Sequence, residues 1–191
     1  MSNAPRTGRG AVDAPSPSQP PRLPDDVREE TLGVAFFDLS RMGEWAGSAE
    51  DALVAGFLQE FYERSAALLA PAGGRIVKLM GDAGLVVFAP DAAEAVILAL
   101  CDLTREARRL AAGYGLDTYL NVNVHVGRVL AGSFGPRGAE RFDVIGKTVN
   151  IAARLGRRGV TLSAQAFRCL GEQARHRFEK IRQPVNYRFR G

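Results

Sequence analysis

Apolar positions in this chain change their spacing several times, and each spacing predicts a different kind of element. Residues 32–39 form a short apolar run that ends next to an acid, which is typical of a buried strand whose C-terminal end reaches a site. Residues 48–68 carry apolar side chains three or four positions apart, which predicts a capped amphipathic helix that stops near Pro71. Residues 120–130 alternate, with valine at every second position from 122 to 126, and predict a long strand.

Two more apolar runs, at 75–80 and 85–88, are joined by Gly81-Asp82-Ala83-Gly84 and predict a β-hairpin with a carboxylate at its tip. The order strand, helix, hairpin, helix, strand predicts an α+β fold, a ferredoxin-like sandwich with helices on one face of a mostly antiparallel sheet. Because proteins with this fold have many different functions, the function has to be inferred from the site residues. The remaining expected elements are a helix at 91–111 capped by Asp91, strands at 142–145 and 160–162, helices at 148–155 and 164–174, and a closing hairpin at 178–181 and 185–189.

The composition indicates where the folded domain begins and argues against several classes of protein. Residues 1–30 are rich in Pro, Ser, Gly and Arg without an apolar period, so we expect a disordered tail there and one domain over 31–191. A net charge of +4 on a balanced background gives no indication of nucleic-acid binding. No run reaches the roughly 20 apolar residues of a membrane span, and no signal peptide is visible, so we expect a cytoplasmic protein. Cys101 and Cys169 lack metal-ligand spacing, which predicts buried, reduced thiols.

Two aspartates are candidates for metal binding. Asp38 lies at the end of the first predicted strand and Asp82 at the tip of the hairpin, so neighbouring strands of one sheet would bring the two carboxylates together. Hard oxygen ligands at one place suit Mg²⁺ or Mn²⁺. Taken separately, each aspartate also fits ordinary turn chemistry. His125, within the alternating strand, is expected to be packed and hydrogen-bonded rather than catalytic.

Residues 142–155 read Phe-Asp-Val-Ile-Gly-Lys-Thr-Val-Asn-Ile-Ala-Ala-Arg-Leu, and this segment strongly resembles the signature of class III adenylate and guanylate cyclases. The agreement extends to Phe-Phe-Asp-Leu at 36–39, to Val-Lys-Leu-Met-Gly-Asp at 77–82, and to Val-His-Val-Gly at 124–127 followed by Ala-Gly at 131–132. These four motifs stand in the order of the family, and the resemblance covers about residues 32–190. It implies the class III cyclase catalytic fold.

The resemblance implies a reaction as well. Asp38 and Asp82 correspond to the aspartates that bind two divalent ions, Mg²⁺ or Mn²⁺, and the backbone carbonyl of Leu39 to a further ligand. One ion would hold the triphosphate of ATP, and the other would lower the pKa of the ribose 3′-hydroxyl, which attacks the α-phosphate in line and expels pyrophosphate. Asn150 would position the ribose. Arg154, four residues later, would stabilise charge on the phosphates in the transition state.

The same resemblance implies a preference for ATP. Lys78 and Asp143 correspond to the pair that reads the purine in adenylate cyclases, where the lysine donates to adenine N1 and the aspartate accepts from the exocyclic amine. Guanylate cyclases typically place Glu and Cys there. Read singly, Lys78 also suits a solvated strand lysine, and Asp143, Asn150 and Arg154 suit turn, cap or surface residues. Because the metal-binding, purine-reading and Asn-Arg residues all occur in the order of the family, we favour the roles that the family implies for them.

By the same analogy the domain works as a head-to-tail homodimer with its active sites at the interface. One protomer would supply Asp38 and Asp82, and the other Lys78, Asp143 and the Asn-Arg pair. Two-fold symmetry makes both sites equivalent, so a lone protomer is expected to be nearly inactive.

Two departures from the family pattern affect the phosphate contacts. After Leu39 the family usually has a small residue, Gly and Phe, whereas this chain reads Ser40-Arg41-Met42-Gly43. Either Arg41 itself clamps phosphate, or its bulk distorts the turn and weakens triphosphate binding. Near the C-terminus the family normally has a lysine that binds the β- and γ-phosphates. Here Lys180 is the nearest candidate for that lysine, with Arg182 next.

The sequence thus predicts an adenylate cyclase that converts ATP to 3′,5′-cyclic AMP and pyrophosphate. Two alternatives stay open: a catalytically impaired nucleotide-binding homologue that acts as a regulatory partner, and a guanylate cyclase.

Overall fold

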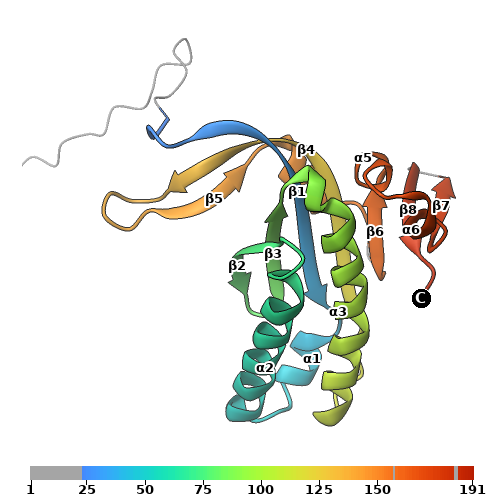
Figure 1. The fold of residues 1–191 in the computed structure, drawn as a ribbon. Helices are drawn as coiled ribbons and strands as arrows, with labels where there is room; N and C mark the ends of the chain where they lie inside the picture. Colours follow the sequence, from blue (N-terminus) through green and yellow to red (C-terminus); the bar gives the residue numbers. More distant parts are fainter. Residues whose placement is uncertain (1–22, 157, 183–184) are drawn as a thin grey trace, which may run out of the picture.

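A single sheet organises the computed structural model, which describes residues 23–156, 158–182 and 185–191. Eight strands of this described part join in the order β2-β3-β1-β4-β6-β8-β7, and β5 pairs with the outer half of β4 (Figure 1). All described strand pairs are antiparallel except β4 with β6. The strands are β1 (Arg28–Leu39), β2 (Arg75–Met80), β3 (Ala83–Phe88), β4 (Leu120–Phe134), β5 (Arg141–Ile145), β6 (Val160–Ser163), β7 (Phe178–Arg182) and β8 (Val185–Phe189).

Two long helices cover one face of this sheet, and the expected α+β fold with a mostly antiparallel sheet is confirmed (Figure 1). None of the described helices is long and apolar enough to cross a membrane. The helices are α1 (Met42–Ala46), α2 (Asp51–Leu69), a short 3₁₀ turn η1 (Pro90–Ala92), α3 (Ala93–Gly113), α4 (Lys147–Ala152), α5 (Ala164–Arg168) and α6 (Glu172–Arg175).

The main core lies between α2, α3 and the sheet. Phe57 and Phe61, four residues apart on α2, present their rings to the sheet and are buried. The Phe61 ring meets Phe37 of β1 edge-on, with 5.7 Å between the ring centroids. Burial of one such aromatic side chain stabilises the fold by about 1.5–3 kcal/mol. Alternate positions of β1 therefore face this core, namely Ala35, Phe37 and Leu39.

A smaller cluster occupies part of the opposite face. Val34, Leu85 and Val129 pack there against Ala152 of α4. The helices therefore lie on both faces, although unequally, whereas the sequence predicted them on one. Gly127 makes the approach of α4 possible, because a Cβ at this position would lie 2.6 Å from the Thr148 hydroxyl oxygen.

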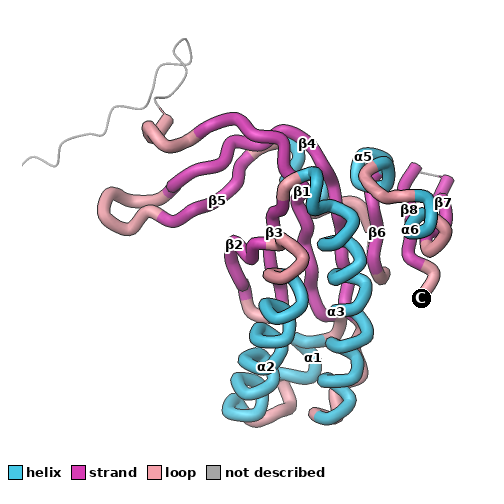
Figure 2. Tube along the Cα trace, in the orientation of Figure 1, coloured by secondary structure: helices cyan, strands magenta, loops and turns pink. Residues whose placement is uncertain are grey.

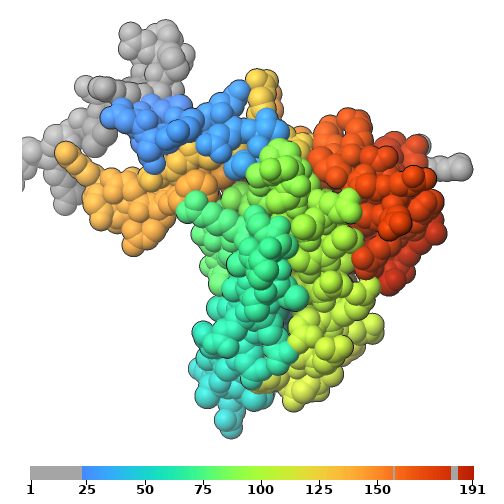
Figure 3. All heavy atoms as spheres, viewed as in Figure 1, coloured from blue at the N-terminus to red at the C-terminus, as the bar shows by residue number. Residues whose placement is uncertain are grey.

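An arm extends from the body of the molecule. It consists of the first half of β1, the second half of β4 and β5, paired through Arg28 with Ala131 and through Leu130 with Ile145 (Figure 2). The space-filling view shows the arm extending to the upper left of α2 and α3 (Figure 3). β1 begins at Arg28, inside the expected tail of residues 1–30, so the fold starts earlier than predicted. Residues 1–22 of that tail lie outside the described residues.

Several helix boundaries differ from the expectation. The helix α1 was not predicted, because only Met42 of its five residues is buried and no apolar period marks it. Helix α3 starts after η1, so Asp91 lies in the 3₁₀ turn and does not cap it. The helix expected at 164–174 is two helices, because the chain turns at Gly171, whose N–H donates to Glu94 of α3. Both cysteines are free, and only Cys101 is fully buried; burial raises the pKa of its thiol to about 12.

Candidate active site

Asp38 faces away from the main core because it alternates with two buried residues. Phe37 and Leu39, its neighbours on β1, point toward α2 and α3 and are only 1% and 4% exposed. The side chain between them must therefore lie on the opposite face, where it is exposed. The end of β1 thus presents a carboxylate to solvent at the sheet surface.

Asp82 reaches the same place from the hairpin of β2 and β3. The turn between these strands has only two residues, Gly81 and Asp82, and Gly81 adopts a φ of 63° that glycine tolerates without strain. Burial raises the pKa of the Asp82 carboxyl, and the negative charge of Asp38 raises that pKa further, although a hydrogen bond from the Leu39 backbone opposes the shift. The structure therefore brings the two predicted aspartates together.

Two polar side chains support this pair. Asn121 of β4, directly opposite Asp38 in the sheet, donates from Nδ2 to Asp38 Oδ2 over 3.2 Å. Its own Oδ1 is buried and accepts no hydrogen bond. The Tyr62 hydroxyl donates to the Gly81 carbonyl over 2.6 Å and fixes the hairpin tip, and burial together with the charge of Asp82 raises the pKa of this phenol. Neither residue was predicted from the sequence.

The oxygen atoms at this place fit a divalent cation. Asp38 and Asp82 supply carboxylates, the backbone of Leu39 contacts Asp82, and the buried Oδ1 of Asn121 has no hydrogen-bond partner. Mg²⁺ is typically held by one or two carboxylates together with waters and phosphate oxygens. Among the residues described there is no group of three His, Cys, Asp or Glu side chains suited to a metal, so a fully protein-ligated site of that kind is not present there.

Lys78 and Asp143 form an ion pair between two strands that are not neighbours in the sheet. Lys78 Nζ of β2 donates to Asp143 Oδ2 of β5 over 2.5 Å, and both side chains are partly exposed. Beside them the Arg75 guanidinium lies 3.7 Å from the centroid of the Phe142 ring. The pairing of β2 with β3 is irregular between Ile76 and Lys78. The structure thus places a donor and an acceptor side by side.

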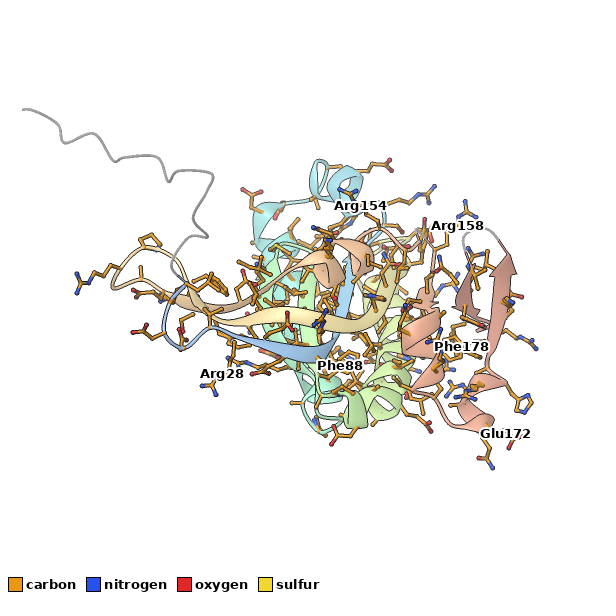
Figure 4. The ribbon with its side chains drawn as sticks, turned by 90° about the horizontal axis from the view of Figure 1, so that it is seen from above. Arg28, Phe88, Arg154, Arg158, Glu172 and Phe178 are labelled. Atoms are coloured by element: carbon orange, nitrogen blue, oxygen red, sulfur yellow. The ribbon has the colours of Figure 1, made fainter. Side chains whose placement is uncertain are left out.

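Asn150 and Arg154 border a cavity of about 640 Å³ on the polar side of β4, β6 and β8. Arg154 lies in the turn after α4 and not within the helix as predicted, since α4 ends at Ala152. Figure 4 shows Arg154 and Arg158 on the same side of the molecule, away from Phe88. Besides Asn150 and Arg154, the cavity is lined by His125, Lys147, Ile151, Leu155, Ser163, Ala164, Gln165, Val185 and Asn186.

Sheet residues hold the segment that carries Arg154. Asn123 of β4 donates to the Gly156 carbonyl over 3.0 Å, and Asn186 of β8 donates to the Leu155 carbonyl over 3.2 Å. His125 is 6% exposed, and its Nδ1 is 2.8 Å from the Ser163 hydroxyl, so the prediction of a packed, hydrogen-bonded histidine is confirmed. These amides were not predicted as site residues, although every second position of β4 from 121 to 125 is polar, and this alternation marks them.

Lys180 does not join this group. It is exposed on β7, opposite Tyr187, and is not among the residues that line the cavity beside Arg154. The neighbouring positions 183–184 lie outside the described residues. Its role as the phosphate-binding lysine stays a prediction.

The comparison with protein families decides what this arrangement is. Residues 26–186 match the model of the adenylate and guanylate cyclase catalytic domain. The chain belongs to this family.

Solved cyclase structures share the fold at low sequence identity. The adenylyl cyclase CyaB from P. aeruginosa is 18% identical with a TM-score of 0.76, over 87% of this chain and 96% of that one. The guanylyl cyclase Cya2 is 19% identical with a TM-score of 0.73, over 85% of this chain and 92% of that one. The monomeric guanylyl cyclase domain of the RhoGC fusion protein from Blastocladiella emersonii is 19% identical with a TM-score of 0.73, over 87% and 98%. A search of curated protein sequences gave no match.

Proposed function

We propose that this cyclase domain is an adenylate cyclase, which forms 3′,5′-cyclic AMP and pyrophosphate from ATP. The observation that carries the proposal is the contact between Lys78 and Asp143. Adenine offers an acceptor at N1 beside a donor at its exocyclic amine, and an ammonium beside a carboxylate matches this order. Guanine offers the reverse order and would leave both charged groups unpaired, which costs about 1–3 kcal/mol for each.

We propose further that the active site forms between two protomers. Support comes from the separation of the site residues, because the described lining of the cavity beside Asn150 and Arg154 does not include Asp38 or Asp82. Exposed apolar side chains border both groups, among them Leu79 and Met80 near the hairpin tip and Ile151 and Val185 beside the cavity. A two-fold dimer would cover these side chains and complete two equivalent sites.

Each group of residues then has one task. Asp38, Asp82 and the Leu39 carbonyl would hold two divalent ions, which when bound neutralise the triphosphate and activate the 3′-hydroxyl. Asn150 orients the ribose for in-line attack. Arg154 donates to phosphate oxygens as negative charge develops.

The test is incubation of the purified chain with ATP or GTP in the presence of Mg²⁺ or Mn²⁺, with products identified by mass. Cyclic AMP from ATP, with at most a small amount of cyclic GMP from GTP, is expected. Efficient production of cyclic GMP would assign the guanylate cyclase instead. Saturable ATP binding without a cyclic product would favour the regulatory partner, a role consistent with the position of Lys180 outside the cavity.

A further inference from the structure

Arg154 lies in an exposed turn, and yet hydrogen bonds hold the backbone on both sides of it. On the N-terminal side, the Arg154 N–H donates to the Ile151 carbonyl of α4 over 3.1 Å. On the C-terminal side, the carbonyls of the next two residues, Leu155 and Gly156, accept from side chains of the sheet. The place of the Arg154 backbone therefore depends on the sheet as well as on α4.

Two asparagines on different strands supply the hydrogen bonds from the sheet. Asn123 Nδ2 of β4 donates to the Gly156 carbonyl over 3.0 Å, and Asn186 Nδ2 of β8 donates to the Leu155 carbonyl over 3.2 Å. The strand β6 lies between β4 and β8. The two asparagines are only 6% and 5% exposed. The turn is thus attached to the sheet at two points, by donors that are themselves packed in place.

The turn also lies directly on β6. A Cβ at Gly156 would be 2.6 Å from the Thr161 hydroxyl oxygen and 3.1 Å from the Thr161 Cβ. Thr161 is 1% exposed and is the residue opposite Asn123 in the pairing of β4 with β6. Because glycine has no Cβ, the backbone can approach the sheet closely enough for Asn123 to reach the Gly156 carbonyl.

Asn123 lowers the stability of the fold and does not line the cavity beside Arg154. Its Oδ1 is buried and accepts no hydrogen bond from the described residues, which is unfavourable for a polar atom. The described lining of the cavity includes Asn186 but not Asn123. The connection between Asn123 and the candidate site is therefore the hydrogen bond to the Gly156 backbone.

We propose that Asn123 and Asn186 are positioning residues, which set the place of the Arg154 guanidinium through the backbone of Leu155 and Gly156. This inference rests on the proposed function of Arg154 and extends it to two residues of the sheet. A donor that stabilises a transition state has to be in place beforehand, and a misplacement of about 1 Å can lower the rate about a hundredfold. Loss of either amide should therefore lower kcat and leave the KM for ATP nearly unchanged.

The test compares the steady-state kinetics of the full chain and of Asn123→Leu, a side chain of similar size that cannot donate. We expect kcat to fall about tenfold to a hundredfold and KM to stay within about twofold. Asn123→Ala is the second variant if the leucine does not fold. Ser65→Ala is the matched control, because the buried Ser65 hydroxyl donates to the Phe61 carbonyl over 2.7 Å within α2, and this variant should keep the kcat of the parent. A parent-like kcat in the folded Asn123 variants would overturn the proposal.

A double variant separates positioning from a general loss of structure. If Asn123 acts through Arg154, Asn123→Leu in an Arg154→Ala background should change kcat by less than about twofold, because the group that it positions is already absent. Ser65→Ala in the same background should also leave kcat unchanged. A further loss as large as the one in the parent background would show that Asn123 acts independently of Arg154, and the proposal would fail.

An NMR measurement distinguishes failure of this inference from failure of the proposed function. If the parent converts neither ATP nor GTP, the proposed function is wrong, and ¹⁵N relaxation then decides whether the asparagines fix the turn. The backbone order parameters of Leu155 and Gly156 should be lower in Asn123→Leu than in the parent and in Ser65→Ala. Equal order parameters in an inactive chain would overturn the positioning role as well.

Discussion

Lys78 and Asp143 are 65 positions apart in the sequence, and yet Lys78 Nζ lies 2.5 Å from Asp143 Oδ2. The two side chains are 41% and 26% exposed, so the pair is accessible to a ligand. Their contact fixes a donor and an acceptor in a single protomer before any nucleotide binds. Because the two side chains are already held in place, a ligand that binds both of them would incur a smaller loss of conformational entropy.

Lys78 and Asp143, which we propose read the purine, have to be exchanged together. Lys78→Glu alone would set two carboxylates against each other at this short distance, so we expect that variant to be less stable as well as less active. The double variant Lys78→Glu with Asp143→Cys removes the repulsion and should shift the ratio of kcat/KM for GTP over ATP by about tenfold to a hundredfold. Steady-state kinetics with both nucleotides measures this ratio. An unchanged ratio in a folded double variant would show that other groups read the base.

Removal of either carboxylate of the proposed metal site, Asp38 or Asp82, should abolish turnover. Asp38→Ala and Asp82→Ala each delete a ligand to a charged ion, and we expect a loss of at least about a hundredfold in kcat. Since Asp38 is exposed and Asp82 lies in a turn, both variants should keep the circular dichroism spectrum of the parent. Asp102→Ala, which removes an exposed aspartate of α3 paired with Arg105, should remain active. Parent-like rates at saturating Mn²⁺ in either site variant would contradict the metal assignment.

Mixing of two inactive variants tests the site between protomers. Asp82→Ala and Arg154→Ala homodimers should both be almost inactive, because every site in them lacks one essential group. In a heterodimer one site carries both lesions and the other carries neither, so activity should return to about half of the parent per heterodimer and about a quarter for a statistical mixture. Native mass spectrometry verifies that heterodimers are present. A mixture that contains heterodimers but is no more active than its components would refute the shared site.

His125 should make the stability of the domain depend on pH. Burial lowers the pKa of this histidine below its ordinary value of 6.5, and the positively charged residues Lys147 and Arg154 line the same cavity. Below about pH 6.5 the unfolded chain therefore binds a proton that the folded chain resists, and the free energy of unfolding falls as the pH decreases. The contribution is fully present above pH 6.5 and is lost toward the lowered pKa.

Urea unfolding at pH 7.5 and at pH 5.5 measures that loss. His125→Gln keeps a polar partner for Ser163 but cannot titrate, so the difference between the two pH values should be smaller than in the parent. His176→Gln, at an exposed position, provides the control and should behave like the parent. An equal difference in the parent and in His125→Gln would show that other groups cause the pH dependence.

The order of elements could be predicted because each depends on a local pattern. The alternation of β4 and the Gly81-Asp82 turn depend only on residues that are adjacent in the sequence, and both are present in the structure as expected. What could not be predicted depends on contacts between distant segments. The break before α6 requires Glu94 of α3, and the end of α4 at Ala152 is followed by a segment that the sheet amides Asn123 and Asn186 hold.

The candidate site shows the same difference between features that depend on neighbouring residues and features that depend on distant contacts. The identities of Asp38, Asp82, Lys78 and Asp143 follow from motifs, and the structure brings each pair together. The supporting role of Asn121 follows only from the register that sets it opposite Asp38. For Arg41 the family pattern indicates a glycine at this position, but only the structure shows that the arginine adopts the left-handed conformation of a glycine.

The alternation at the end of β1 links activity to correct folding. Phe37 and Leu39 are buried under the helices while Asp38 between them faces solvent. If β1 slipped by one residue against β4, the carboxylate would enter the core and both apolar side chains would leave it. Such a chain would be unstable before it was ever tested for catalysis. The packing of α2 against β1 therefore selects the strand register, and molecules that fold in this register have the Asp38 carboxylate on the exposed face of the sheet.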